Sequence, residues 1–318
     1  MINAARIDVH QHVVPPFWAE ALPANGGDPS GWKSPQWTPA SALEFMDSQQ
    51  IATGILSLTA PSVVGWKPEE RRAMTRRVND YTASLVAAHP SRFGNFATLP
   101  LPDLEGALQE VEYAFHSLRA DGVVLLSNYE GTYLGDASLE PLWSELDRRS
   151  AVVFIHPAKP LISLIPGMPG PLLDYPFDTT RSAVQLVLNG VMSRHRRVKV
   201  ILSHAGGFLP YAAHRFAELS PGVRPDAPSK DEQLETYRRF HFDTALSSPS
   251  ALPSLAAFAG TRQILFGSDY PYAPTAVSKS VTRELDAYEG FDAQAQVAVN
   301  RGNALGLFPR LASAAMQT

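Results

Sequence analysis

The sequence predicts one α/β domain folded as a (β/α)8 TIM barrel, with a loop-rich cap over the C-terminal face of the barrel. Eight apolar segments of strand length occur along the chain, and segments with helical periodicity separate them. The 318 residues suffice for this fold, since a typical barrel of this kind takes about 250 residues. Histidine or aspartate residues stand at the ends of several strands, where a barrel would bring them together.

The predicted strands and helices alternate in chain order. The strands are Ile7–His10, Ala52–Leu58, Phe93–Thr98, Gly122–Leu126, Val152–His156, Val198–Ser203, Phe240–Thr244 and Gln263–Gly267. The clearest helices are Pro68–Ala88, Leu104–Leu118, Leu139–Arg149, Thr179–Ser193 and Ser250–Gly260. Eight such units favour a closed barrel over an open sheet, and they make residues 1–318 a single domain.

Two segments interrupt this alternation. Residues 15–39 are rich in proline and contain three glycines and three tryptophans, so they are too aromatic for a disordered linker. We expect them to form the cap over the mouth of the barrel. Residues 157–178 are also rich in proline and glycine and follow the fifth strand, which predicts a second long loop at the same end.

The composition excludes several classes of protein. The formal net charge of −4 gives no basic surface for nucleic acid, and the basic residues are scattered apart from short runs such as Arg194, Arg196 and Arg197. There are no cysteines, so any metal must be bound through nitrogen and oxygen. No segment is apolar enough to be a signal peptide or a membrane span, and we expect a cytoplasmic protein that binds neither nucleic acid nor membrane.

Five polar residues at strand ends are candidate metal-site residues. His10 and His12 lie two apart on the first strand and therefore project to the same side. His156, His204 and Asp269 follow the fifth, sixth and eighth strands. Each of them alone could be an ordinary hydrogen-bonded residue, but together they would converge at the C-terminal rim, where buried imidazoles and a carboxylate need a shared partner. One divalent cation would be that partner, with Zn²⁺ favoured and Mn²⁺, Co²⁺ or Fe²⁺ possible.

The chain resembles the amidohydrolase superfamily, in the branch of α-amino-β-carboxymuconate-ε-semialdehyde decarboxylase and γ-resorcylate decarboxylase. Six motifs in family order carry this resemblance over nearly the whole chain: residues 7–12 (IDVHQH), 97–100 (ATLP), 154–157 (FIHP), 202–207 (LSHAGG), 242–245 (FDTA) and 265–271 (LFGSDYP). The resemblance implies that His10, His12, His156 and Asp269 bind the metal and that His204 is the catalytic histidine. It also implies that Arg215 binds the substrate carboxylate across the interface of a homodimer.

The sequence departs from the semialdehyde decarboxylase in one respect. That enzyme has a second arginine in the helix before its second strand, but residues 39–47 (PASALEFMD) contain none. A small monocarboxylic acid, such as a hydroxybenzoate or a methylsalicylate, therefore fits better than a dicarboxylate. Phe17 and Trp18, with Trp32 and Trp37, could pack on its ring, although they could equally fill the interior of the cap.

The expected reaction is non-oxidative decarboxylation, with Asp269 as the proton donor and His204 as its acid–base partner. Hydrolysis of a lactone, amide or ester at the same metal site is the alternative, because the metal-site motifs do not separate the two reactions. A metal-bearing binding protein is a third possibility, but every residue needed for catalysis is present.

Overall fold

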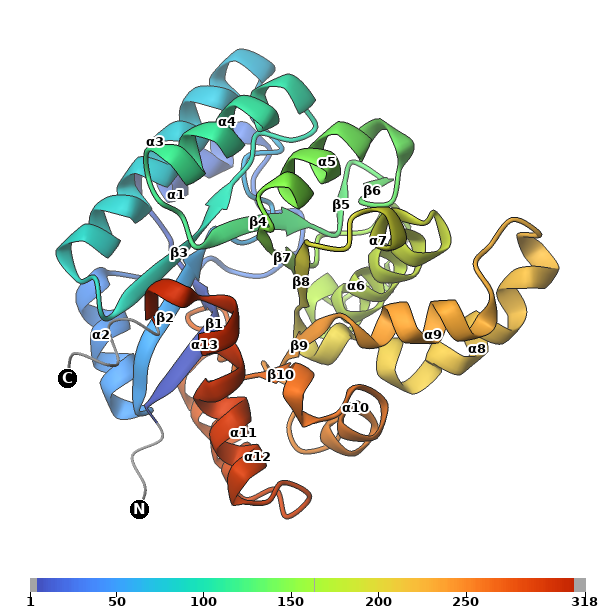
Figure 1. Ribbon diagram of the computed structural model, residues 1–318. Helices are drawn as coiled ribbons and strands as arrows, with labels where there is room; N and C mark the ends of the chain where they lie inside the picture. The colour runs from blue at the N-terminus through green and yellow to red at the C-terminus, as the bar shows by residue number, and fades with distance from the viewer. Residues whose placement is uncertain (1–4, 163, 312–318) are drawn as a thin grey trace.

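The computed structural model describes residues 5–162 and 164–311 and confirms the predicted barrel. Eight parallel strands follow one another around the barrel, with helices outside them (Figure 1). The strands are β1 (Arg6–His12), β2 (Ile51–Ser57), β3 (Phe93–Thr98), β4 (Gly122–Leu126), β7 (Val152–His156), β8 (Lys199–Leu202), β9 (His241–Asp243) and β10 (Ile264–Leu265). Of these, β3, β4 and β7 have the bounds that the sequence predicts. A short hairpin of β5 (Asn128–Tyr129) and β6 (Thr132–Tyr133) follows β4.

Backbone hydrogen bonds complete the barrel between its last and first strands. The segment after β10 accepts from β1 at two points, Val9 N to Phe266 O (3.0 Å) and His12 N to Tyr270 O (2.8 Å). In the other direction, Asp269 N donates to His10 O (2.8 Å). Asp269 is therefore fixed by its own backbone beside the residues of β1.

The helices surround the strands. They are α1 (Pro16–Ala21), α2 (Pro39–Ser48), α3 (Pro68–Ala88), α4 (Leu104–His116), α5 (Glu140–Arg148), α6 (Gly170–Leu188), α7 (Val191–Arg194), α8 (Leu209–Val223), α9 (Lys230–Arg238), α10 (Leu252–Ala259), α11 (Thr275–Asp286), α12 (Ala293–Val297) and α13 (Asn303–Leu307). Short 3-10 turns occur at Leu22–Asn25, Ala137–Leu139, His204–Gly206 and Thr261–Gln263, and a π-helical turn spans Ala298–Gly302. None of the helices in the described ranges combines the length and apolar character needed to cross a bilayer.

The predicted start of the helix after the fifth barrel strand is wrong. Residues 170–178 were expected to continue a loop, but they form the first half of α6, with Pro176 inside the helix. Proline removes one backbone hydrogen bond, here the one to the carbonyl of Leu172. Leu172 lies near the start of the helix and is 67% exposed, so water can satisfy that carbonyl. The proline-rich composition of residues 170–178 therefore reflects the start of a helix, where proline is tolerated. It does not indicate a continuous loop.

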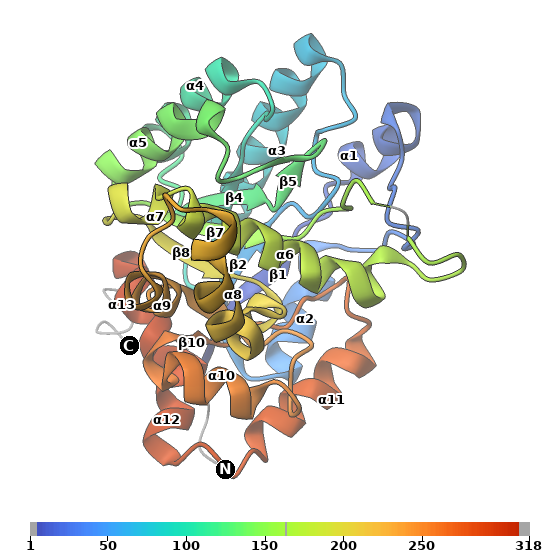
Figure 2. The same ribbon diagram turned by 90° about the vertical axis from the view of Figure 1, so that its right-hand side faces the viewer.

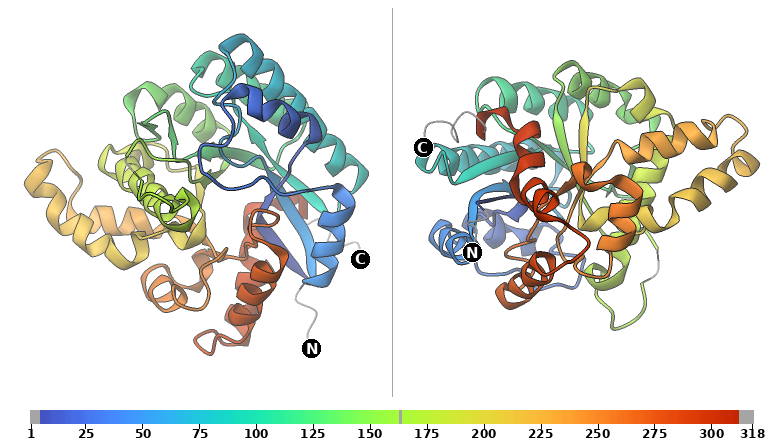
Figure 3. Two further views of the ribbon diagram at one scale, coloured as in Figure 1. Left: turned by 180° about the vertical axis from the view of Figure 1, so that it is seen from behind. Right: turned by 60° about the horizontal axis from the view of Figure 1, so that its bottom comes forward.

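The core has two parts. The barrel interior is filled by apolar side chains of the strands together with Phe308, which closes the end opposite the cap. A larger layer lies between the strands and the surrounding helices. Figure 3 shows the cap crossing one end of the barrel and α13 covering the other.

The predicted cap packs against two loops at the C-terminal end of the strands. Trp18 is completely buried, and its Nε1 donates to Ser62 O (2.9 Å) in the loop after β2. Gly170 N donates to Ser30 O (3.2 Å), which ties the start of α6 to the cap. Figure 2 shows α1 and the segment before α6 at the same end of the barrel. These contacts join residues 15–39 to the loop after β2 and to the start of α6.

Candidate metal centre

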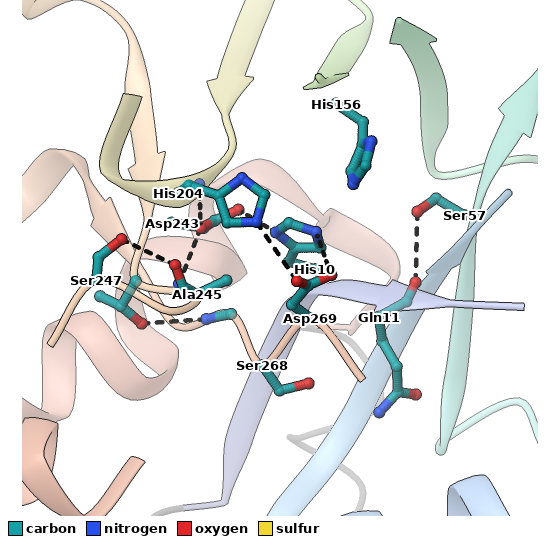
Figure 4. Close-up of polar contacts among 12 residues, drawn as sticks. His10, Gln11, Ser57, His156, His204, Asp243, Ala245, Ser247, Ser268 and Asp269 are labelled. Carbon is teal, nitrogen blue, oxygen red and sulfur yellow. Dashed lines mark hydrogen bonds and ion pairs between the residues drawn. The ribbon is translucent and has the colours of Figure 1, made fainter. Parts of the chain in front are cut away.

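Four of the predicted residues meet at the C-terminal end of the barrel. His10, His12, His156 and Asp269 are buried, and each offers one ligand atom that lies within 4.8 Å of the other three. We call these four residues the metal cluster. His10 and His12 come from the end of β1, His156 from the end of β7, and Asp269 from the segment after β10. Figure 4 shows His10, His156 and Asp269 pointing toward a common centre.

The hydrogen bonds of the three imidazoles fix which nitrogen faces the centre. Each Nδ1 has an oxygen partner outside the cluster: His10 pairs with Asp243 Oδ2 (2.7 Å), His12 with Ser57 Oγ (3.1 Å), and His156 with Pro157 O (2.9 Å). A carboxylate or a carbonyl can only accept, so His10 and His156 donate from Nδ1. A neutral ring then has its lone pair on Nε2, the atom that faces the cluster.

These inward-facing atoms fit one divalent cation. His10 Nε2 and His12 Nε2 are 3.1 Å apart, and Asp269 Oδ1 lies 3.3 and 3.0 Å from them. Two lone pairs at this distance repel each other unless a proton or a cation lies between them. Three imidazole nitrogens and one carboxylate oxygen form the donor set that suits zinc and related divalent ions.

The electrostatics of the cluster favour positive charge at His10 and neutral rings at His12 and His156. Burial lowers the pKa of His10, but Asp243 and Asp269 more than offset this effect and raise it to about 10. Burial lowers the pKa of His12, and burial together with the neighbouring imidazoles lowers that of His156 well below its usual value. The two carboxylates thus stabilise a positive charge at His10, and a divalent cation would take the place of that proton.

Asp243 at the end of β9 connects the metal cluster with His204. Its side chain is completely buried. Oδ2 contacts His10, while Oδ1 accepts from the backbone N–H groups of His204 and Ala245, each at 2.9 Å. One carboxylate therefore orients a predicted metal ligand and also fixes the turn that carries the predicted catalytic histidine.

His204 lies beside the cluster on its accessible side. Its Nε2 is 3.5 Å from Asp269 Oδ2, the carboxylate oxygen that does not face His12. The side chains of His204 and Asp269 are 12% and 10% exposed, whereas those of His10 and His12 are completely buried. A small molecule would therefore approach the centre from the side of His204 and Asp269.

The turn after β8 gives His204 this place. His204 and Ala205 both have positive φ angles, 52° and 56°, and Gly207 follows with φ 63°. A Cβ atom on Gly207 would lie 1.9 Å from Pro176 O of α6. Glycine is therefore required for α6 to pack against this turn.

The residues predicted to bind substrate lie outside the metal cluster. Trp18 has no free surface in this conformation. Phe17 packs on α3, with its ring 5.7 Å from that of Tyr81 and 3.9 Å from the guanidinium carbon of Arg77. Arg215 is exposed on α8, and no carboxylate of the described residues lies within 4 Å of its guanidinium. A single chain thus brings none of the three to the metal cluster.

The sequence alone did not identify Tyr272 as a site residue. Its ring lies 5.4 Å from that of His12, edge to face. Its hydroxyl is buried, and among the described residues it has no hydrogen bond of normal geometry. Burial raises the pKa of Tyr272, although the nearby Ser34 offsets part of this effect. The sequence feature that could have pointed to Tyr272 is its position, three residues after Asp269, in the segment that follows the eighth strand.

Comparison with known proteins identifies the family. Residues 7–310 match the amidohydrolase family. The chain is 43% identical to 6-methylsalicylic acid decarboxylase of Penicillium expansum, over 96% of this chain and 97% of that protein. It is 31% identical to gamma-resorcylate decarboxylase of a Rhizobium species, over 72% of this chain and 76% of that protein.

A solved structure agrees with these sequence relatives. An amidohydrolase II crystal structure, 32% identical, superposes with a TM-score of 0.89 and covers 96% of this chain and 99% of that one. The amidohydrolase match spans nearly all of the barrel strands and every residue of the metal cluster. The chain belongs to the amidohydrolase family, in the branch that contains the aromatic-acid decarboxylases.

Proposed function

We propose that this enzyme catalyses the non-oxidative decarboxylation of a small aromatic carboxylic acid of the hydroxybenzoate or methylsalicylate type. The observation that carries the proposal is that one ligand atom from each of the three histidines and Asp269 lies within 4.8 Å of the others, with His204 on the accessible side. The relatives named for 6-methylsalicylic acid and gamma-resorcylate support the class of substrate.

His10, His12, His156 and Asp269 would hold one divalent metal ion, for which we propose Zn²⁺ first and Mn²⁺, Co²⁺ or Fe²⁺ as alternatives. When bound, the ion supplies positive charge that orients the acid and withdraws electron density from it. The buried partners of the ligand rings, Asp243 and Ser57, keep the imidazoles in the orientation that binding needs.

His204 and Asp269 are the proposed acid–base pair. The reaction adds a proton to the ring carbon that bears the carboxylate. The bond to the carboxylate carbon then breaks, its electron pair stays with the ring, and CO2 leaves. Asp269 Oδ2 faces His204, so a proton taken from solvent by His204 can reach the substrate through this oxygen. Asp269 alone is a poor proton store, because the histidines around it outweigh the effect of burial and hold its pKa well below the usual value.

Tyr272 is the proposed substrate contact inside a single chain. Its buried hydroxyl lacks a normal hydrogen bond, and such a group costs free energy unless a ligand satisfies it. Its ring stands edge to face against His12, next to the metal cluster. A hydroxyl or carboxylate oxygen of the aromatic acid would be the partner.

Arg215 is proposed to act from the neighbouring subunit of a homodimer. The exposed position of Arg215 on α8 is compatible with contact to a second copy of the chain. Sedimentation of the active enzyme tests this proposal. A dimer whose kcat/KM falls in Arg215→Gln supports it, and a monomer with full activity contradicts it.

The reaction is tested by incubating the metal-loaded protein with 6-methylsalicylate and 2,6-dihydroxybenzoate and measuring CO2 and the corresponding phenol. We expect release of both products, and we expect its loss in His204→Ala. The control is His116→Ala, since His116 is exposed on α4. Absence of CO2 from both acids with metal bound, together with hydrolysis of a lactone or an amide, would contradict the proposal.

A further inference from the structure

A cavity lies at the opposite end of the strands from the metal cluster. Its volume is about 370 Å³, and residues at the starts of β8 and β9 and in α13 line it. Lys199 is the first residue of β8 and His241 the first residue of β9. We call this space the basic cavity; its lining residues are Met192, Arg196, Val198, Lys199, Arg239, His241, Gln263, Asn303, Gly306 and Leu307.

The basic cavity is separate from the metal site although the same strands reach both. β8 runs from Lys199 to Leu202, two residues before His204, and β9 runs from His241 to Asp243. At about 3.3 Å per residue, the first residues of these strands lie roughly 7–17 Å from the residues of the metal site. A ligand in the basic cavity would therefore not occupy the metal site.

Two of the positive charges of the basic cavity, those of Arg196 and Lys199, have no ion-pair partner among the described residues. In the run from Arg194 to Arg197, Arg194 pairs with Glu140 and Arg197 with Asp147. Arg196 stands between them, and in the described ranges no carboxylate lies within 4 Å of its guanidinium or of the Lys199 ammonium. A single surface cation without a partner is common, but here Arg196 and Lys199 line the same concave space.

Arg239 is held in the wall of the same cavity. Its Nη1 donates to Met192 O (3.1 Å) and its Nη2 to Arg196 O (3.2 Å), so the guanidinium has a fixed orientation. Burial and the charge of Arg196 lower the pKa of Arg239, while Glu235, one helical turn before it, acts in the opposite direction. Burial is the largest cause of this lowering and the charge of Arg196 adds to it, so a bound anion would stabilise the charged guanidinium.

His241 adds a hydrogen-bonding group to the cavity. Its Nδ1 is buried, and among the described residues it has no hydrogen-bond partner. Burial and the nearby Lys199 lower its pKa to about 4, so the ring is neutral at pH 7 and one nitrogen can donate. Neutral amides of Gln263 and Asn303 and the apolar side chains of Met192 and Leu307 form the remaining wall.

We propose that the basic cavity binds a phosphate group, either as free phosphate or as part of a small phosphorylated metabolite. Arg196 donates to the carbonyl of Ser193 through Nε (3.2 Å), which leaves its two Nη groups to donate to phosphate oxygens. Lys199 adds an ammonium donor, and Arg239, whose Nη groups already donate to backbone carbonyls, adds a third positive charge in the wall. The cavity is larger than a phosphate ion requires, so a phosphate monoester can place its organic part against Met192 and Leu307.

Calorimetric titration of the metal-loaded enzyme with inorganic phosphate, at constant ionic strength in chloride, tests this proposal. We expect binding that weakens at least tenfold in the double variant Arg196→Gln/Lys199→Gln, whose two sites are exposed and whose decarboxylase activity should stay unchanged. The matched control is Arg197→Gln, which removes an equivalent but paired charge from the same segment and should retain the wild-type affinity. Equal affinity in all three proteins, or no binding at millimolar phosphate, would overturn the proposal.

Two further measurements locate and identify the ligand. The pKa of His241 can be measured from its imidazole NMR signals, and phosphate in the basic cavity should raise it. Phosphate bound only at the metal would leave the pKa of His241 unchanged, and that result would contradict the proposal. Glycerol 3-phosphate distinguishes the two sources of the group. Tighter binding than that of inorganic phosphate supports a phosphorylated metabolite, and equal or weaker binding supports free phosphate.

Discussion

Replacing Asp243 by asparagine should weaken metal binding through His10. The carboxylate oxygen Oδ2 accepts from His10 Nδ1 at 2.7 Å, and Oδ1 accepts from the N–H groups of His204 and Ala245. In Asp243→Asn, the amide oxygen can still accept from the two backbone groups. The NH2 group then faces His10 Nδ1, where a donor would meet a donor. The imidazole avoids this by moving its proton to Nε2, which removes the lone pair that faces the metal.

The expected loss follows from the role of this contact. A partner that orients a metal-bound histidine typically contributes about 10- to 100-fold to metal affinity or activity, which corresponds to about 1.4–2.8 kcal/mol. Because Asp243 is completely buried, water cannot replace the lost interaction. Competition with a chelator of known affinity measures the change in metal affinity, and CO2 release measures the change in kcat/KM.

Asp178→Asn is the matched control for this experiment. Asp178 is also completely buried and accepts from Ser127, Asn128 and Tyr133, but no contact joins it to the metal cluster among the described residues. We expect this variant to lose stability while it keeps its metal affinity. The reasoning is refuted if Asp243→Asn binds metal within twofold of wild type, or if both variants lose metal affinity equally.

Three further predictions concern other parts of the chain. Tyr272→Phe should lower kcat/KM about tenfold, mainly through KM, because it removes one hydrogen bond to a charged substrate; an unchanged KM would exclude this contact. Burial lowers the pKa of His241 from 6.5 to about 4, so the folded state takes up fewer protons than the unfolded state and stability falls as the pH drops from 6.5 towards 4. In urea titrations, the free energy of unfolding of His241→Gln should decrease by up to about 3 kcal/mol less than that of wild type over this pH range. Equal decreases in the two proteins would contradict this prediction. Gly207→Ala should cost at least about 2 kcal/mol, because its Cβ would lie 1.9 Å from Pro176 O, whereas Gly222→Ala, with open space around it, should be neutral or slightly stabilising in thermal unfolding.

The sequence predicted the residues of the metal cluster because their signal is local. His10, His156 and Asp269 each end an apolar segment, and parallel strands in a barrel must bring such ends to one rim. The bounds of β4 and β7 were predictable because each strand is a nearly continuous apolar segment, whereas β3 (FGNFAT) was recognised although it includes Asn95. The later strands are shorter than predicted, and β10 is only Ile264–Leu265, because hydrogen bonding and not apolar character sets where a strand ends.

The cap and the tyrosine contact depend on packing that no local pattern reveals. The sequence shows that Phe17 and Trp18 are aromatic but not which way they face. In the structure Trp18 enters the core and Phe17 packs on α3. Tyr272 reaches His12, 260 residues before it in the chain, only because the segment after β10 lies beside β1. Pro176 was misread because composition cannot distinguish a proline inside a helix from a proline in a loop.

Adding metal stepwise to metal-free enzyme while recording CO2 release from 6-methylsalicylate tests the central claim most directly. The site has one set of three imidazoles and one carboxylate, so activity should rise linearly and stop at one equivalent of Zn²⁺ or another divalent ion. His156→Ala, which lacks one of these imidazoles, should need a large excess of metal or stay inactive. Full CO2 release from the metal-free enzyme, or a break at two equivalents, would contradict a single metal centre built from these four residues.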